Sequence, residues 1–196
     1  MNRGLRIFSV LLFCAAMLAA GQQPASEHHS PEFRSMQAKL AHLKQNAAKT
    51  HPDSKPTELT EAEVNAYFNE GGVKLPKGVS KVHLTSQPGT IDGHAQVDFE
   101  PIMEGKGSTN PLLGMFSGTH DVHILAQAAG SAGTGTIRVQ SVYLDGIELP
   151  QVVLQFFAQR YITPKYPNVG VNSTFKLPLR IDSAVVEAGR VRLMQR

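Results

Sequence analysis

All eight histidines of this chain lie at or before position 123, and two of them have a spacing that could serve metal chemistry. His120 and His123 are three residues apart, which on a helix would place two imidazoles on one face as metal ligands. The residues around them alternate between apolar and polar types. This alternation predicts a strand, on which the two side chains point to opposite faces. His28 and His29 lie in a polar linker and are expected to bind nothing. We therefore expect neither a metal site nor a cofactor.

A hydrolase is the second chemistry that the residue types suggest, because Ser117, His120 and Asp121 lie close together in the sequence. The chain lacks the Gly-x-Ser-x-Gly turn that exposes a nucleophilic serine, and it lacks a zinc-binding helix motif. His94 falls on the polar face of a predicted strand and His83 on a mixed face, and we expect both to be solvated. We expect no catalytic residue; a hydrolase is the alternative that esterase assays would test.

Apolar side chains are the stronger candidates for function. Residues 150–162 predict a helix, because Pro150 suits its first position and apolar residues cover about 200° of its circumference. No charge occurs in it before Arg160, so most of its surface needs a cover of protein or lipid. The glycine-rich residues 104–118 carry large apolar side chains, which suit a lid on the sheet, a flap at a pocket mouth or a membrane-touching tip. The candidate lining residues are Val152, Val153, Phe156 and Phe157 of the helix and Leu112, Leu113, Met115 and Phe116 of the loop.

Strands are needed to position these candidates. Alternating apolar and polar residues predict strands at 79–86, 91–99, 119–127 and 136–144, and a hairpin closes the chain. The predicted fold class is α+β. Its main feature is a long, curled antiparallel sheet, or half-barrel, wrapped around the apolar helix at 150–162.

Two further helices precede the strands. Residues 31–49 predict an amphipathic helix, because Ser30 can cap it and one narrow apolar stripe runs along it. This stripe suits either packing on the protein's own domain or docking on a membrane or a partner. A short helix is predicted at 60–70, where Thr60 and Glu63 have the spacing of a capping box.

Residues 1–21 have the features of a secretory signal. Arg3 and Arg6 precede an apolar run that ends in small residues, which suits cleavage near residues 20–25. The run is short for a membrane span, and an uncleaved anchor is the alternative. We expect export to the periplasm or the extracellular space. Cys14 is the only cysteine and lies in this segment, so the mature chain can form no disulfide.

The charge balance argues against nucleic acid as a partner. The formal net charge of +3 falls to +1 without Arg3 and Arg6, because 17 basic residues then face 16 acidic ones. No run of basic residues interleaved with aromatic ones occurs, and such a run is typical of nucleic-acid-binding proteins.

Several short motifs resemble those of a known family. They are, in order, Asp145-Gly146, Leu149-Pro150, the apolar helix, Leu177-Pro178, Ile181 and Gly189-Arg190-Val191, and the helix beginning at Leu59-Thr60 resembles the family's opening segment. Over residues 58–194 the chain resembles the LmeA-like secreted phospholipid-binding proteins, which belong with the tubular lipid-binding (TULIP-like) folds. The resemblance implies a half-barrel that holds acyl chains between helix and sheet, and it implies no catalytic residue.

These features predict three segments: a signal peptide at 1–21, a linker and amphipathic helix at 22–57, and a TULIP-like lipid-binding domain at 58–196. We expect a non-enzymatic protein of the cell envelope that binds a phospholipid or another acyl-chain ligand, contacts a membrane peripherally, and acts in lipid transport or envelope maintenance. The alternative is a structural or interaction module of the envelope that docks through the helix at 31–49.

Overall fold

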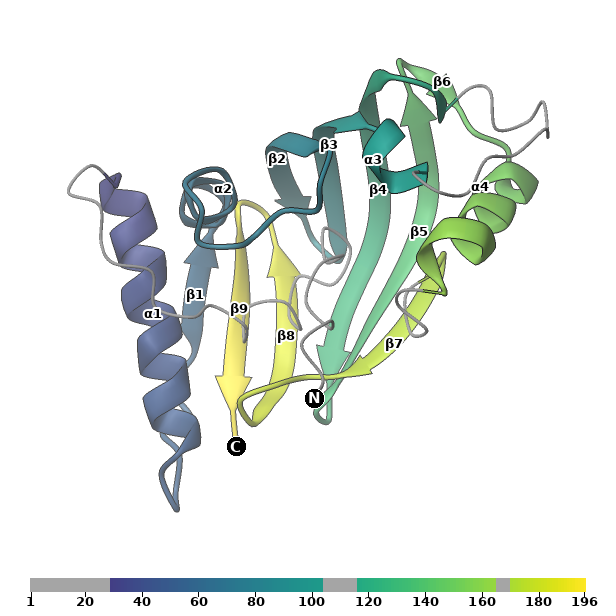
Figure 1. The fold of residues 1–196 in the computed structure, drawn as a ribbon. Coiled ribbons are helices and arrows are strands. Elements are labelled where there is room, and N and C mark those ends of the chain that lie inside the picture. Colours follow the sequence, from purple (N-terminus) through teal and green to yellow (C-terminus); the bar gives the residue numbers. More distant parts are fainter. Residues whose placement is uncertain (1–28, 104–115, 165–169) are drawn as a thin grey trace, which may run out of the picture.

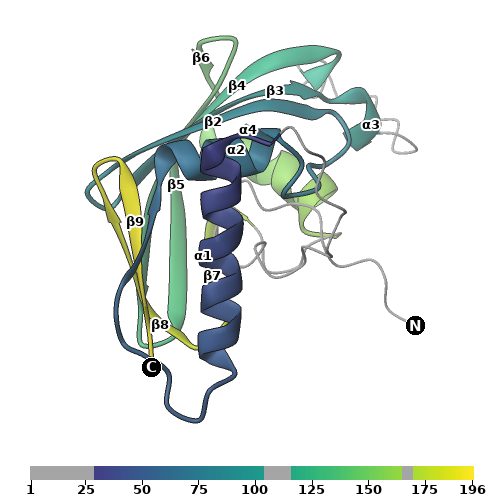
Figure 2. The same ribbon diagram turned by 90° about the vertical axis from the view of Figure 1, so that its left-hand side faces the viewer.

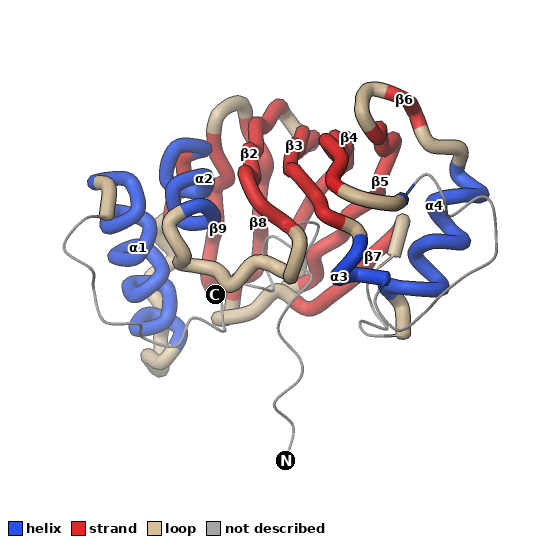
Figure 3. The backbone as a smooth tube through the Cα atoms, turned by 45° about the horizontal axis from the view of Figure 1, so that its top comes forward, coloured by secondary structure: helices blue, strands red, loops and turns tan. Residues whose placement is uncertain are grey.

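A computed structural model describes residues 29–103, 116–164 and 170–196. The predicted signal segment and most of the glycine-rich loop at 104–118 lie outside these residues. Within them, nine strands form one antiparallel sheet that is not closed, and the helices lie on one of its faces (Figures 1 and 3). The predicted α+β class with a large antiparallel sheet is therefore confirmed.

The elements predicted from sequence are present within the described residues, although β4 continues beyond its predicted end to Ser131. The helices are α1 (Pro31–Ala47), α2 (Glu61–Asn69), α3 (Glu100–Met103) and α4 (Gln151–Phe157), which continues into a π-helical turn, η3 (Ala158–Ile162). The strands are β1 (Thr57–Thr60), β2 (Val79–Gln87), β3 (Thr90–Asp98), β4 (Thr119–Ser131), β5 (Thr134–Leu144), β6 (Ile147–Glu148), β7 (Asn172–Lys176), β8 (Ile181–Glu187) and β9 (Arg190–Gln195). Among the helices of the described residues, none has both the length and the apolar composition that crossing a bilayer requires.

The sheet divides at β4. One edge of this strand pairs with β5. The other edge pairs first with β3 and then meets β8, where Gly130 pairs with Ala184. β3 leads on to β2, and β8 leads on to β9 and β1, so two wings extend from the same strand. The wings stand at an angle to each other, which gives the sheet the bend seen in Figure 2.

Gly130 permits this junction because it has no side chain. A Cβ atom at this position would lie 2.8 Å from the Cβ atom of Ala184 and 3.0 Å from a methyl group of Leu177. Carbon atoms in contact prefer separations of about 3.5–4.0 Å. Glycine inside a strand often marks such a close approach of two backbones.

α1 packs on the wing formed by β8, β9 and β1. Its apolar stripe consists of Phe33, Met36, Leu40 and Leu43, and each of these side chains is at most 3% exposed. The stripe shares one core with β1, α2, β8 and β9. The boundary predicted at residue 57 therefore does not separate two cores, and α1 belongs to the same packed unit as residues 58–196. Of the two alternatives for the stripe, the structure shows packing on the protein's own domain.

Polar contacts fix both ends of α1. At its start, Ser30 caps the helix by accepting a hydrogen bond from the Phe33 amide at 3.1 Å. Ser30 also donates through its amide and its hydroxyl to the carboxylate of Glu70, at 2.8 and 2.6 Å. At its end, the buried side chain of Asn46 donates to the side-chain oxygen of Gln195 in β9 at 2.8 Å. These contacts orient α1 on the sheet.

Glu63 links α1 to α2. It forms the predicted capping box with Thr60, whose amide donates to the Glu63 carboxylate at 2.8 Å. The same carboxylate accepts hydrogen bonds from Lys39 at 2.7 Å and Ser35 at 2.6 Å, both on α1. Burial alone would raise the pKa of Glu63, but these hydrogen bonds outweigh it and hold the pKa below its usual 4.5. The Glu63 charge therefore stabilises the fold above pH 4.5, and this contribution is lost as the pH falls through the lowered pKa.

Candidate ligand-binding cavity

A tight turn between β5 and β6 sets the position of α4. Asp145 and Gly146 both have a positive φ, 49° and 81°, as two-residue hairpin turns favour. The chain then pairs back on the end of β5 through β6. Pro150 begins the helix, because its carbonyl accepts hydrogen bonds from the amides of Val153 and Leu154 at 2.9 and 3.1 Å. The helix runs on the same side of the sheet as α1 and α2 (Figure 2).

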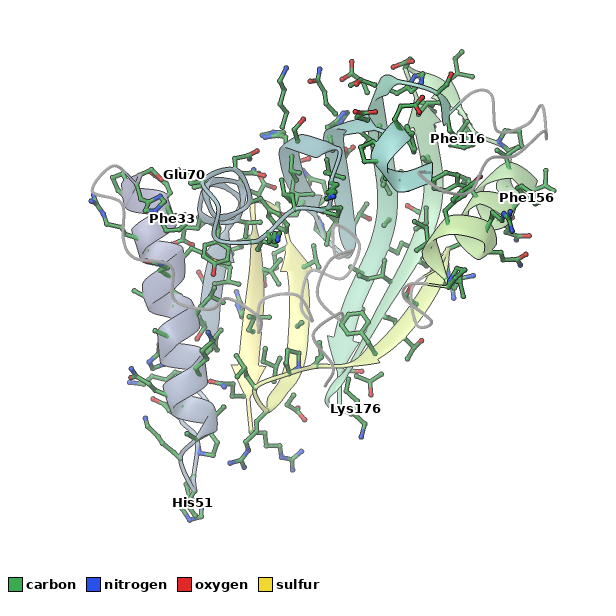
Figure 4. The ribbon with its side chains drawn as sticks, viewed as in Figure 1. Phe33, His51, Glu70, Phe116, Phe156 and Lys176 are labelled. Carbon is green, nitrogen blue, oxygen red and sulfur yellow. The ribbon has the colours of Figure 1, made fainter. Side chains whose placement is uncertain are left out.

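The rotation of α4 differs from the sequence prediction. Val153 and Tyr161 are 5% and 1% exposed, whereas Val152 and Phe156 are 68% and 38% exposed. Figure 4 shows Phe156 on the outer side of the helix. Val152 and Phe156 therefore do not line the space between α4 and the sheet, contrary to the prediction. The helix carries two neighbouring apolar rows, and hydrophobicity alone does not distinguish the row that faces the sheet.

Phe157 joins α4 to the sheet through a cluster of aromatic rings. Its ring stacks on Phe116 with centroids 4.5 Å apart and meets Phe99 edge to face at 5.7 Å. Phe99 and Phe116 contact each other edge to face at 5.2 Å, and Tyr161 lies 5.0 Å from Phe157. Each such aromatic pair stabilises by about 0.5–1.5 kcal/mol beyond its buried area. The cluster therefore fixes α4 against the end of β3.

A cavity of about 180 Å³ lies between α4 and the inner face of the sheet. Its roof is formed by residues of α4 and η3, and its floor by alternate residues of β3, β4 and β5. The roof residues are Leu154, Phe157, Ala158 and Ile162, and the floor residues include Ala95, Val97, Val122, Ile124, Val142 and Leu144. Almost none of the lining surface is polar. The cavity is therefore built to exclude charged and strongly hydrated groups.

The size and polarity of the cavity limit what it can bind. An apolar cavity of about 150 Å³ in another protein stays dry and binds benzene, so this larger cavity has room for a ring or a short run of methylene groups. Each methylene group buried in such a site contributes about 0.8 kcal/mol. In the described lining, His94 is the only ionisable residue, and alternation along β3 turns its imidazole to the opposite face. A ligand would therefore keep its polar end outside.

The structure places the predicted lining residues in three different environments. Phe116 and Phe157 line the cavity, and Val153 is buried in the core beside it. Val152 and Phe156 face outward. The remaining three, Leu112, Leu113 and Met115, lie outside the described residues.

Most of the lining was missed because it comes from strands. Ala95 and Val97 alternate with polar residues in the strand predicted at 91–99, and this alternation was the available signal. The sequence analysis placed the sheet around the helix at 150–162 but named no strand residue as part of the lining. Leu154 was also missed, although it belongs to the apolar arc of the helix predicted at 150–162.

His120, the other feature with chemical potential, lies beside the aromatic cluster, with its ring centroid 5.9 Å from that of Phe99. Its Nδ1 atom lies 2.6 Å from a carboxylate oxygen of Asp145, and its Nε2 atom lies 2.8 Å from the backbone carbonyl oxygen of Ser117. Both ring nitrogens therefore face acceptors, which favours the imidazolium form. The hydrogen bond to Asp145 is the main reason that the pKa of His120 is raised above 6.5. His120 is therefore not placed to act as a base for the Ser117 hydroxyl, because its Nε2 atom donates to the backbone carbonyl of Ser117.

No protein-family model, curated protein or solved structure matches this chain. The resemblance to LmeA-like proteins therefore stays an expectation from sequence.

Proposed function

We propose that this protein is a non-enzymatic binding protein for an acyl-chain ligand, which it holds in the cavity between α4 and the sheet. The observation that supports the proposal best is the almost wholly apolar lining of that cavity. A site of this kind gains affinity from apolar burial, with few polar groups to fix the orientation of the ligand. In this proposal the bent sheet acts as a TULIP-like half-barrel with α4 as its covering helix.

The cavity volume sets the part of the ligand that is enclosed. A space of about 180 Å³ takes only part of a long acyl chain. Six enclosed methylene groups would contribute about 5 kcal/mol before the cost of association. The rest of the chain and the headgroup would extend past the cavity, so a phospholipid would bind by the end of one chain.

Exposed apolar side chains beside the cavity support contact with a membrane surface. Ile147 of β6 and Val152 of α4 are 71% and 68% exposed, and Phe156 lies on the same side of α4 as Val152. The three residues belong to the segment that leads from β6 into the cavity roof. Their insertion into the headgroup region would bring the cavity close to the lipid that it takes up. This role fits an exported protein of the periplasm or the extracellular space, which the signal-like residues 1–21 suggest.

Extraction and binding measurements test the proposal. We expect organic extraction of the purified mature protein to release fatty acid or phospholipid, which mass spectrometry would identify. The protein stripped of lipid should bind a fluorescent fatty acid in a saturable manner at one site per chain. The absence of both copurifying lipid and saturable fatty-acid binding would overturn the proposal.

A further inference from the structure

The outer face of the cavity wall carries a row of histidines from three neighbouring strands. His94 of β3 pairs directly with His83 of β2 on one side and with His123 of β4 on the other. His123 in turn pairs with Tyr143 of β5. Directly paired residues of an antiparallel sheet point to the same face, so these side chains gather on one surface.

Two of these imidazoles converge on a carboxylate. The Nε2 atom of His123 lies 2.9 Å from the Oδ1 atom of Asp92, and the Nε2 atom of His94 lies 3.1 Å from the same oxygen. Asp92 is two residues before His94 on β3, so it projects from the same face of the strand. The three donor atoms all lie within 4.8 Å of one another.

The neighbouring rings orient the imidazole of His123. The rings of His94 and His123 are stacked, with centroids 4.1 Å apart and planes inclined by 6°. Tyr143 stacks on the other side of His123, with centroids 5.2 Å apart. His123 is therefore enclosed between two rings, which fixes the direction in which its Nε2 atom points.

The contacts inside the cluster do not satisfy its polar atoms. The Oδ1 atom of Asp92 and the Nε2 atom of His123 are shielded from solvent, and within the described residues neither forms a well-oriented hydrogen bond. Charging both stacked imidazoles would place two like charges face to face, which is unfavourable. Two neutral imidazoles and one carboxylate can instead share a single divalent cation, which would satisfy all three donor atoms.

The spacing of the donor atoms suits a tetrahedral metal ion. Zinc binds imidazole nitrogen and carboxylate oxygen at about 2.0–2.2 Å, so neighbouring ligand atoms of a tetrahedral site lie about 3.3 Å apart. The measured separations of 2.9 and 3.1 Å from Asp92 to the two histidines need to open only slightly. A metal ion lies close to the plane of each imidazole that binds it, and the rings of His94 and His123 are nearly parallel. The more exposed ring of His94 must therefore turn about its side-chain bonds before both nitrogens can bind one ion. Imidazole nitrogen suits zinc, copper and nickel rather than calcium or magnesium.

We propose that Asp92, His94 and His123 form a binding site for one divalent transition-metal ion, represented by Zn²⁺, on the outer face of β3 and β4. Either water or the imidazole of His83, which pairs with His94, completes the coordination of the ion. No metal site was predicted from the sequence, because only neighbouring histidines, His28 with His29 and His120 with His123, have a spacing that suggests one. The ligands come together through the pairing of two strands, and His120 instead contacts Asp145.

Zinc titration of the untagged, metal-stripped protein tests this site. Calorimetry should show one Zn²⁺ bound per chain. The variants His94→Gln and His123→Gln should each lose affinity by at least about tenfold, because the loss even of groups that only orient the ligands costs 10–100-fold. The matched control is His51→Gln, since His51 lies in the exposed loop after α1, far from this cluster (Figure 4). Equal zinc affinity in His123→Gln and His51→Gln, or no saturable binding by the unmodified protein, would overturn the proposal.

A second measurement needs no variant. Co²⁺ added to the unmodified protein should give the intense visible absorption bands of a tetrahedral site, and Zn²⁺ should displace them. A Co²⁺ spectrum identical to that of the ion in water would contradict the site. Circular dichroism of each metal-free variant would confirm that the substitutions, which lie on the outer face of the sheet, leave the fold intact.

Discussion

The side chains of this protein make two kinds of contact: some join residues a few positions apart in the sequence, and others join residues of neighbouring strands. Ser30 and Thr60 cap their helices as the sequence predicts, because a cap and its acceptor amide are three residues apart. His120 instead contacts Asp145, which lies 25 residues later in the sequence. His120 is in β4, and Asp145 directly follows the neighbouring strand β5. Residue-level chemistry of this second kind depends on register, which one sequence does not show.

The pair of His120 and Asp145 gives a prediction about pH. The pKa of His120 is raised chiefly by its hydrogen bond to Asp145, so Asp145→Asn should bring this pKa back towards 6.5. A raised histidine pKa stabilises the fold fully below pH 6.5, and the contribution is lost as the pH rises through the raised value. NMR titration of the His120 ring protons in both proteins would measure the change. An unchanged His120 pKa in Asp145→Asn would show that the contact does not form in solution.

At the scale of elements, the sequence predicted the strands and helices well and the rotation of α4 poorly. Strand alternation and helix caps are local patterns, and they are present at their expected positions. The side of α4 that faces the sheet depends on the direction in which the chain leaves the Asp145-Gly146 turn and reaches Pro150. Because apolar residues occupy both the inward and the outward row of α4, the sequence predicted more burial of this helix than the structure has.

The outward row of α4 should matter for membrane contact and little for folding. We expect the double variant Val152→Ser/Phe156→Ser to bind vesicles of phosphatidylethanolamine and phosphatidylglycerol at least about tenfold more weakly, because it removes two exposed apolar groups. The matched control is Val185→Ser/Met194→Ser, which removes exposed apolar side chains from β8 and β9. Vesicle flotation would compare them. Equal binding by both double variants would rule out α4 as the membrane-contacting surface.

The junction of the two wings should depend on the absence of a side chain at Gly130. Gly130→Ala places a Cβ atom 2.8 Å from that of Ala184, and overpacking of this kind costs about 1–3 kcal/mol. Removing the opposing atom in the pair Gly130→Ala/Ala184→Gly should recover part of that loss. Urea unfolding of the two single variants and the double variant would measure the coupling. Strictly additive free energies of unfolding would mean that the two strands are not in close contact.

At the scale of the whole molecule, two hydrophobic cores lie on the same face of the bent sheet. α1 and α2 cover the wing of β8, β9 and β1, and α4 covers the inner face of β3, β4 and β5. The first core contains only small spaces of about 20 Å³ among the pockets lined by described residues, whereas the second contains the cavity of about 180 Å³. The α+β class and the large antiparallel sheet could be predicted from sequence. The division of the sheet at β4 could not, because it depends on the single pairing of Gly130 with Ala184.

The arrangement of the cavity and the histidine cluster connects the two proposals at this scale. Strands β3 and β4 present apolar side chains to the cavity on one face and Asp92, His94 and His123 on the other. The two sites share a wall but no side-chain atoms that bind a ligand. Loss of zinc binding should therefore leave acyl-chain binding in place, and the two proposals can fail independently.

Filling the cavity tests the central claim most directly. Ala158 lies in the cavity roof, so Ala158→Phe would place a ring in the space that the ligand occupies. Ala62→Phe makes the same substitution at an exposed position of α2 and serves as the control. With circular dichroism confirming that both variants are folded, titration with a fluorescent fatty acid would measure their affinities. We predict that Ala62→Phe binds like the unmodified protein and that Ala158→Phe binds at least about tenfold more weakly, since its ring excludes several methylene groups. Equal affinity in all three proteins would contradict binding in this cavity.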